Sequence, residues 1–309
     1  MKLLGKGAML AVLAVFAAAN AQTSGETPLL KTEDLRKLLE DNSDDVSALA
    51  KSLLGTQDTN RLFYFPTHDE PATPSDWGFA YDNVNFKSAD GTKLHGWFLK
   101  ARADKPKGTV VFSHGNAGSI GHHLGFVMWL AEAGYQVFMY DYRGFGKSEG
   151  VVNREGMVQD VRAAFDYVVK RPDVDATKLI SYGHSLGGAK SVTALARGKL
   201  KGLRAIIIDG TFSSYQAMAR IMGGEIGASL ITDDLSPCKC VKLITETPLL
   251  VIHGDQDNVV PLSQGKELYD LANQPKTFFE VKGGTHGNSL ARDGGAYRKR
   301  MLTWLEEVM

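Results

Sequence analysis

The chain has 309 residues, of which 43% are hydrophobic. This length and composition provide for a sizeable buried core and argue against a disordered protein. Lysine and arginine together number 35, as do aspartate and glutamate, so no excess charge favours nucleic acid or an anionic membrane as a partner.

The first residues are typical of a secretory signal peptide. Lys2 and Lys6 are basic, residues 8–19 form an apolar run, and Ala19-Asn20-Ala21 supplies the small residues of a cleavage site. We therefore expect residues 1–21 to be removed and the mature protein to be periplasmic or secreted, with no stable membrane span. The alternative is an N-terminal membrane anchor, for which the apolar run is short.

Residues 22–75 are expected to form a helical lead-in. Acidic residues follow Thr32 where a helix would begin, and leucines recur after them at helical spacing. From Tyr81 the pattern changes to strands, and two of these flank Asp90-Gly91, which is a strong hairpin signal. The main domain is therefore placed at 76–309.

Apolar runs and helical patterns then alternate along the chain. The runs expected as strands are 109–113, 136–140, 179–182, 205–208, 249–252 and 277–281, and helices are expected at about 120–133, 155–170, 186–198, 262–273 and 291–308. Such alternation predicts an α/β fold with a mostly parallel central sheet and helices on both faces.

One interval, 211–247, interrupts this alternation with apolar residues among glycines. One interpretation is a small cap, in which Met218, Ile221 and Met222 line a substrate pocket. The other is an ordinary helix pair packed on the core. The same interval holds Cys238 and Cys240, whose close spacing favours two free thiols over a strained disulfide or a metal site.

Reactive residues follow four of the predicted strands, where ligands of parallel sheets gather. They are the turn His114-Gly115-Asn116, the serine of Gly183-His184-Ser185-Leu186-Gly187, Asp257 and His286. The serine is either part of a glycine-rich turn or the nucleophile of a strained strand-to-helix elbow.

The second interpretation uses all four strand ends. A serine hydroxyl needs a base to take its proton, a histidine provides that base, and an acid orients the histidine. Ser185, Asp257 and His286 occur in the order expected for a serine hydrolase with a parallel sheet. The N–H of Leu186 and one from Gly115 or Asn116 would then form an oxyanion hole.

Four segments in this order resemble a known family: FSHGNAGSIGHH, YDYRGFGKSEG, GHSLGG and HGDQDNVVP. From about Tyr81 to the C-terminus the chain resembles the α/β-hydrolase superfamily, in its ABHD-type and bacterial esterase-like branch. The resemblance implies an α/β-hydrolase fold with a small cap insertion. It also favours Asp257, three residues after Gly254, as the acid. Asp255 is then expected to be a turn residue, and Asp209 is a weaker alternative for the acid.

Other polar residues near these motifs are expected to have structural roles. Asp141 and Arg143 are expected to pair or hydrogen-bond and so hold a turn near the site, and His114 is expected to shape a turn. His122 and His123 are adjacent on a predicted helix, so their side chains point apart, and we expect surface or lid-contacting residues rather than metal ligands. His184 is given no catalytic role.

The sequence therefore predicts an exported serine hydrolase that cleaves carboxylic or thio esters through an acyl-enzyme intermediate. The expected substrate is a small acyl ester, with no cofactor, no metal and no nucleic acid involved. Two alternatives remain: a peptidase or amidase on the same fold, and a binding module without catalysis. The intact set of three residues argues against the binding module.

Overall fold

The computed structural model describes residues 64–309. The predicted signal peptide and the predicted lead-in up to residue 63 lie outside the described residues. The described chain divides into two units, which are treated separately: residues 64–213 with 235–309, called the sheet domain here, and residues 214–234.

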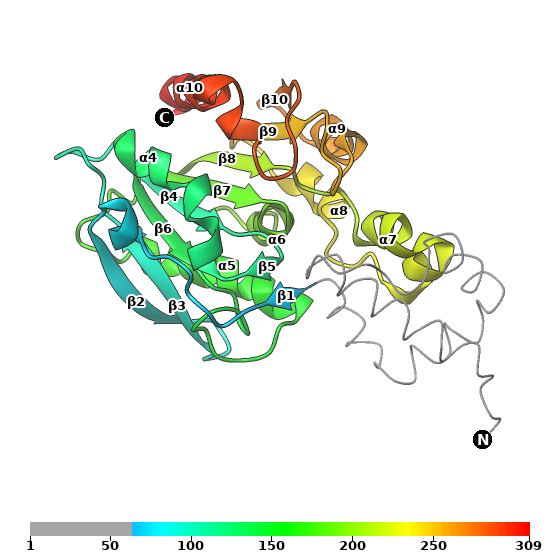
Figure 1. The fold of residues 1–309 in the computed structure, drawn as a ribbon, viewed down its shortest axis with the longest axis horizontal. Coiled ribbons are helices and arrows are strands. Elements are labelled where there is room, and N and C mark those ends of the chain that lie inside the picture. The colour runs from blue at the N-terminus through cyan, green and yellow to red at the C-terminus, as the bar shows by residue number, and fades with distance from the viewer. Residues whose placement is uncertain (1–63) are drawn as a thin grey trace. The chain divides into compact units, whose positions relative to one another are not determined.

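An eight-stranded sheet forms the centre of the sheet domain, in the order β10-β9-β8-β7-β4-β6-β3-β2 (Figure 1). Strand β3 pairs antiparallel with both β2 and β6, and all other neighbours are parallel. The strands are β2 (Tyr81–Lys87), β3 (Lys93–Leu99), β4 (Thr109–Ser113), β6 (Gln136–Tyr140), β7 (Leu179–His184), β8 (Leu203–Asp209), β9 (Leu249–Gly254) and β10 (Lys276–Val281).

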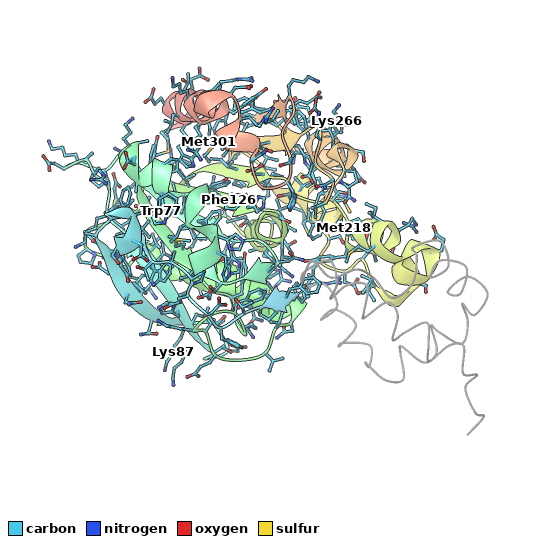
Figure 2. The ribbon with its side chains drawn as sticks, in the orientation of Figure 1. Trp77, Lys87, Phe126, Met218, Lys266 and Met301 are labelled. Carbon is cyan, nitrogen blue, oxygen red and sulfur yellow. The ribbon has the colours of Figure 1, made fainter. Side chains whose placement is uncertain are left out.

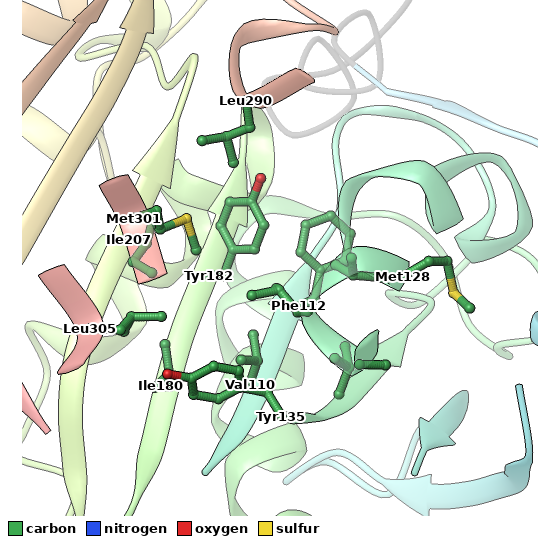
Figure 3. Packing of buried hydrophobic residues seen from close by; sticks show 14 of the residues in the cluster. Val110, Phe112, Met128, Tyr135, Ile180, Tyr182, Ile207, Leu290, Met301 and Leu305 are labelled. Carbon is green, nitrogen blue, oxygen red and sulfur yellow. The ribbon is translucent and has the colours of Figure 1, made fainter. Parts of the chain in front are cut away.

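Helices cover both faces of this sheet, so the predicted fold class is confirmed. On one face, side chains of η3 (Ile120–Phe126), α4 (Met128–Glu132) and α10 (Arg292–Val308) share a core with alternate residues of the strands. Helices α5 (Arg154–Val168), α6 (Leu186–Leu195) and α9 (Leu262–Leu271) also pack against strands of the sheet. Figure 3 shows part of the first core, where Phe112, Ile180, Tyr182 and Met301 meet.

The central strands are buried along their whole length. All five residues of β4 and all six of β7 are buried, which agrees with their unbroken apolar sequences and with helices on both faces. The polar ends of these strands therefore emerge at the carboxyl edge of the sheet, where the predicted reactive residues follow.

The hairpin predicted at Asp90-Gly91 joins β2 to β3, with Lys87 opposite Lys93. Gly91 has a φ of 87°, a left-handed conformation that glycine adopts at no steric cost. The pairing of β2 with β3 therefore forms around a turn that the local sequence already favours.

The described end of the predicted helical lead-in is not an α-helix. It contains a short strand, β1 (Phe65–Pro66), and the 3₁₀ turn η2 (Pro74–Trp77). Strand β1 pairs parallel with β5 (Ala117–Gly118), in the turn that follows β4. Two-residue strands form through such long-range pairing and leave no periodic pattern in the sequence, so this pairing was not predicted.

The predicted cap interval contains helices and no strand among its described residues. Helix α7 (Tyr215–Leu230) is interrupted at Gly223 and Gly224, whose backbone angles are not helical. It lies in the separate unit 214–234. Helix α8 (Pro237–Cys240) and the 3₁₀ turn η4 (Val241–Leu243) belong to the sheet domain.

Among residues 64–309, no helix combines the length and the apolar character needed to cross a bilayer.

Candidate active site

Ser185 lies at the junction of β7 and α6, in a backbone conformation that side chains rarely adopt. Its φ is 54° and its ψ is −118°, and such a conformation costs on the order of 1–3 kcal/mol. Three backbone hydrogen bonds hold it: Ser185 N donates to Asp209 O at 2.8 Å, and Gly188 N and Ala189 N donate to Ser185 O at 3.1 and 3.3 Å. The fold therefore fixes this serine at the carboxyl edge of the sheet.

The glycines around Ser185 allow backbone segments to approach each other closely. A Cβ on Gly187 would lie 1.9 Å from the carbonyl oxygen of Ser113, the last residue of β4. A Cβ on Gly183 would lie 2.5 Å from Gly188 Cα. No side chain fits at either position, so α6 begins directly against the end of the neighbouring strand.

His286 and Asp257 form a hydrogen-bonded pair beside this turn. His286 follows β10 and Asp257 follows β9, and His286 Nδ1 lies 2.8 Å from Asp257 Oδ2. Because a carboxylate accepts, Nδ1 donates and the lone pair of the neutral ring is on Nε2. No described group hydrogen-bonds to His286 Nε2, Ser185 Oγ included. This tautomer is the one that a general base on the serine needs.

The surroundings of Asp257 favour its ionised form. Burial acts to raise the pKa of this carboxyl, but the hydrogen bond and charge of His286 and the backbone N–H groups of Val259 and Val260 outweigh it and lower the pKa below the ordinary value. These two N–H groups donate to Oδ1 at 2.9 and 2.8 Å. His253 Nε2 lies 3.5 Å from the other oxygen and is held by Val260 O at 2.8 Å.

Gly210, the residue after β8, brings this pair next to Ser185. A Cβ on Gly210 would lie 3.2 Å from His286 Nδ1 and 3.4 Å from Asp257 Oδ2. The preceding residue, Asp209, accepts the backbone hydrogen bond from Ser185. The three predicted site residues therefore meet around the end of β8.

The two alternative acids have other partners. Asp255 Oδ1 accepts from Gly283 N at 2.7 Å and so holds the loop between β10 and His286. Asp209 is buried and accepts from Tyr182 Oη at 3.3 Å, and burial raises its pKa to about 7. Only Asp257, among these three acids, hydrogen-bonds to His286 in the described chain.

The predicted oxyanion donors lie on both sides of Ser185. Leu186 is the first residue of α6, so its N–H has no acceptor within the helix. Asn116 follows β4, and its carbonyl oxygen accepts from Phe65 N at 2.8 Å. A Cβ on Gly115 would lie 3.9 Å from Ser185 Cβ. The turn after β4 is therefore fixed by β1 and lies next to the serine.

Asp141 and His114 support this turn, as predicted, whereas Arg143 pairs with Asp160 and Asp90 and not with Asp141. Asp141 Oδ1 accepts from Ile120 N at 2.8 Å, and its carboxylate lies 3.9 Å from His114 Nε2. His114 Nδ1 contacts Gly115 O at 2.8 Å. Burial lowers the pKa of His114 well below its ordinary value, which keeps this ring neutral.

One of the two histidines of η3 differs from the expectation of surface residues. His122 is exposed, as expected, and contacts the N-cap residue Ser119. His123 is only 9% exposed, because η3 packs against the sheet. His184 is also buried, between the rings of Phe126, at 4.2 Å, and His286, at 4.8 Å, measured between centroids.

The residues predicted to bind substrate belong to the separate unit 214–234. Met218 is buried, whereas Ile221 and Met222 are exposed, and their role stays a prediction. Cys238 and Cys240 are free thiols in α8. Among residues 64–309, no three or more His, Cys, Asp or Glu side chains are placed so that they could hold a metal ion.

Two residues of this site had no role in the sequence analysis, His253 and Gly210. The only sequence signal for them was their position. His253 is the last residue but one of the buried strand β9, and Gly210 directly follows the buried strand β8. A histidine packed under the acid and a glycine facing the imidazole are recognised only once the strands are placed side by side.

Known proteins resemble this chain over most of its length. Residues 104–223 match a family model described as "Serine aminopeptidase, S33". The uncharacterized protein YfhR of Escherichia coli K12 is 37% identical over 248 residues, which cover 79% of this chain and 86% of that protein. The alpha/beta hydrolase domain-containing protein WAV2 of Arabidopsis thaliana is 34% identical, covering 80% of this chain and 87% of its own. The chain belongs to the α/β-hydrolase superfamily.

Solved structures with this fold include hydrolases of two kinds. An esterase of Pyrococcus furiosus matches with a TM-score of 0.68 at 20% identity, over 80% of this chain and 98% of its own. An acylaminoacyl peptidase of Pyrococcus horikoshii matches with a TM-score of 0.58 at 21% identity, over 74% of this chain and 42% of its own. At these identities the likeness shows the fold, and with the family match it supports a hydrolase.

The close approach at Gly187 predicts a strong effect on stability. In this α/β-hydrolase, Gly187→Ala should lower the free energy of unfolding by at least about 2 kcal/mol, because the new methyl group collides with a backbone carbonyl that cannot move aside. Gly125→Ala is the matched control, since nothing lies within 4 Å of a Cβ there. Urea unfolding compares the two, and equal stabilities would contradict the proposed packing.

Asp209 predicts a pH dependence of stability. Its pKa is raised from 3.8 to about 7 on folding, so between these pH values the folded protein binds a proton that the unfolded chain has lost. The contribution of Asp209 to stability therefore falls as pH rises through this range and is constant above it. Asp209→Asn cannot titrate.

Urea unfolding of both proteins at several pH values between about 4.5 and 8 tests this prediction. The free energy of unfolding of the wild type, relative to the Asn variant, should decrease with rising pH. A difference that stays constant, or that increases, would show that Asp209 does not retain its proton on folding.

Proposed function

We propose that this α/β-hydrolase is an exported serine hydrolase that cleaves carboxylic or thio esters through an acyl-enzyme intermediate. The observation that carries the proposal is the 2.8 Å hydrogen bond between His286 Nδ1 and Asp257 Oδ2, next to a serine held at φ 54°. A glycine-rich turn with only a structural role has no need of an oriented imidazole and an ionised acid beside it.

In the proposed reaction, Ser185 Oγ attacks the ester carbonyl carbon while His286 Nε2 takes the hydroxyl proton. Asp257 stabilises the imidazolium that forms. When the carbon–oxygen or carbon–sulfur bond to the leaving group breaks, His286 returns the proton to that group. A water molecule then attacks the acyl-enzyme, with the same proton transfers, and releases the carboxylic acid and free Ser185.

Backbone N–H groups stabilise the negative oxygen of the tetrahedral intermediate in this proposal. Leu186 supplies one, at the start of α6, and the turn of Gly115 and Asn116 supplies the other. Each such donor is worth about 3 kcal/mol of transition-state stabilisation. The hydrogen bond from Phe65 N to Asn116 O holds the second donor in place.

Removing the proposed nucleophile should abolish both labelling and turnover. Ser185→Ala is expected to lose covalent labelling by a fluorophosphonate. Its kcat/KM for phenyl acetate should fall by a factor of about a thousand or more. The measurements are in-gel labelling and a phenol-release assay, with circular dichroism to confirm folding. A folded variant that is still labelled would place the nucleophile at another residue.

An arylamide in the same assay separates the proposed ester hydrolase from an amidase. The amide needs stronger protonation of its leaving nitrogen, so we expect the ester to be hydrolysed much faster after correction for intrinsic reactivity. A higher corrected rate for the amide would favour the peptidase or amidase alternative.

The acid is tested by a matched pair of variants. Asp257→Asn should lower kcat by about 10³- to 10⁴-fold, because the amide no longer stabilises the imidazolium or enforces the tautomer. Asp255→Asn should change kcat by less than about threefold, since its amide oxygen still accepts from Gly283 N. Steady-state kinetics decide, and a larger loss in the Asp255 variant would contradict the assignment of the acid.

Met218, Ile221 and Met222 of α7 are kept as the proposed substrate-binding residues. Methionine suits a wall that accommodates acyl chains of different shape, and the interruption at Gly223 and Gly224 gives α7 a bend.

Export is proposed from residues 1–21. Mass spectrometry of the protein from its native host should find a mature N-terminus at Gln22. A functional protein that still begins at Met1 would instead favour the retained anchor.

A further inference from the structure

His123 places a hydrogen-bond acceptor beside Ser185. Its Nδ1 lies 3.0 Å from the backbone carbonyl of Ser119, four residues earlier. A carbonyl only accepts, so Nδ1 of His123 carries the hydrogen and the lone pair of the neutral ring is on Nε2. No described residue hydrogen-bonds to this Nε2.

The free lone pair faces the position that a substrate would occupy next to the serine. A methyl group on Gly115 would lie 3.4 Å from His123 Nε2, 3.5 Å from His184 Cδ2 and 3.9 Å from Ser185 Cβ. One small group therefore touches all three side chains. The absence of a side chain at Gly115 leaves that space open, between the proposed oxyanion donors and His123.

His123 is neutral at the pH at which Ser185 would react. Burial and the charge of His122 lower the pKa of His123 to about 4, although the hydrogen bond to Ser119 acts to raise it. A neutral ring with a hydrogen on Nδ1 has no proton on Nε2. It therefore does not stabilise an oxyanion, and its lone pair is open to a donor from outside the chain.

The rest of this wall is aromatic, and it includes His184, whose Nδ1 has no hydrogen-bond partner in the described chain and lies 4.0 Å from Asp209 Oδ2. The ring of Phe126, labelled in Figure 2, lies 5.8 Å from the ring of His123 and 4.2 Å from that of His184. His114 Nδ1 is occupied by Gly115 O. His123 Nε2 is the atom of this wall that the bond from Nδ1 to Ser119 O fixes as an acceptor, so it can distinguish one acyl group from another.

We propose that His123 selects acyl groups that carry a hydrogen-bond donor, a hydroxyl or an amide N–H, on the carbon next to the ester carbonyl. This inference rests on the proposed function of Ser185. An acyl group with only hydrogens or methyl groups on that carbon would cover the lone pair of Nε2 without giving it a partner. A site built for a donor rejects such an analogue.

A matched pair of substrates measures this selection. Phenyl 2-hydroxypropanoate, as each enantiomer, and phenyl 2-methylpropanoate differ only by a hydroxyl in place of a methyl group. The ratio of their kcat/KM values is divided by the ratio of their hydroxide-catalysed rates, to remove intrinsic reactivity. For the wild type, the corrected ratio should be about 3 to 10 for one enantiomer, the effect of one hydrogen bond.

Two variants locate the effect at Nε2. The amide of His123→Asn replaces Nδ1 and still donates to Ser119 O, but it leaves nothing at the position of Nε2, so the corrected ratio should fall to about one. The longer His123→Gln reaches that position with an amide oxygen and should recover at least half of the preference. A structural role alone would lower both substrates equally and leave the ratio unchanged.

The outcomes separate this inference from the proposed function. A wild-type corrected ratio near one, or a ratio that His123→Asn leaves intact, overturns the role of His123 while Ser185 still catalyses. A wild-type ratio near one overturns the role of His123 whether or not the variants fold, and His123→Gln gives a second variant if His123→Asn does not fold. Hydrolysis of both esters by folded Ser185→Ala would instead overturn the proposed function.

Discussion

The site depends on one strained residue and on the contacts that keep it strained. Ser185 adopts φ 54° because its N–H is bound to Asp209 O and its carbonyl to Gly188 N. These bonds form only because α6 starts against β4, where Gly187 has no room for a side chain. The buried parallel strands β4 and β8 hold the residues that make these contacts. The packing of the core therefore keeps Ser185 in its strained conformation at the edge of the sheet.

Two carboxyl groups near this serine are shifted in opposite directions. Asp257 and Asp209 follow or end neighbouring strands, yet the pKa of Asp257 is lowered by His286 and two backbone N–H groups, while burial raises that of Asp209 to about 7. Asp209 is more deeply buried than Asp257 and accepts fewer hydrogen bonds, and both differences contribute to the contrast. It leaves one charge beside the imidazole, and a second charge there would compete for the orientation of His286.

Much of this arrangement could be predicted from local sequence. The strands at 109–113 and 136–140 have the predicted bounds, because both faces of these strands are buried and their apolar runs are unbroken. Features that depend on long-range contact were not predicted. They include the pairing of β1 with β5 and the burial of His123. A helical pattern indicates the face of the helix on which His123 lies, but it does not indicate which element packs against that face. The predicted helix at 120–133 is instead η3 followed by α4, since glycines at 121 and 125 weaken a continuous helix.

The most direct test of the account is to trap the acyl group that Ser185 is proposed to carry. The wild-type protein is mixed with a phenyl ester, quenched in acid during turnover, digested and examined by mass spectrometry. The account predicts one acyl group on the peptide that contains Ser185, formed at a rate at least as high as turnover. Turnover without this adduct, or an acyl group on another residue, would contradict it.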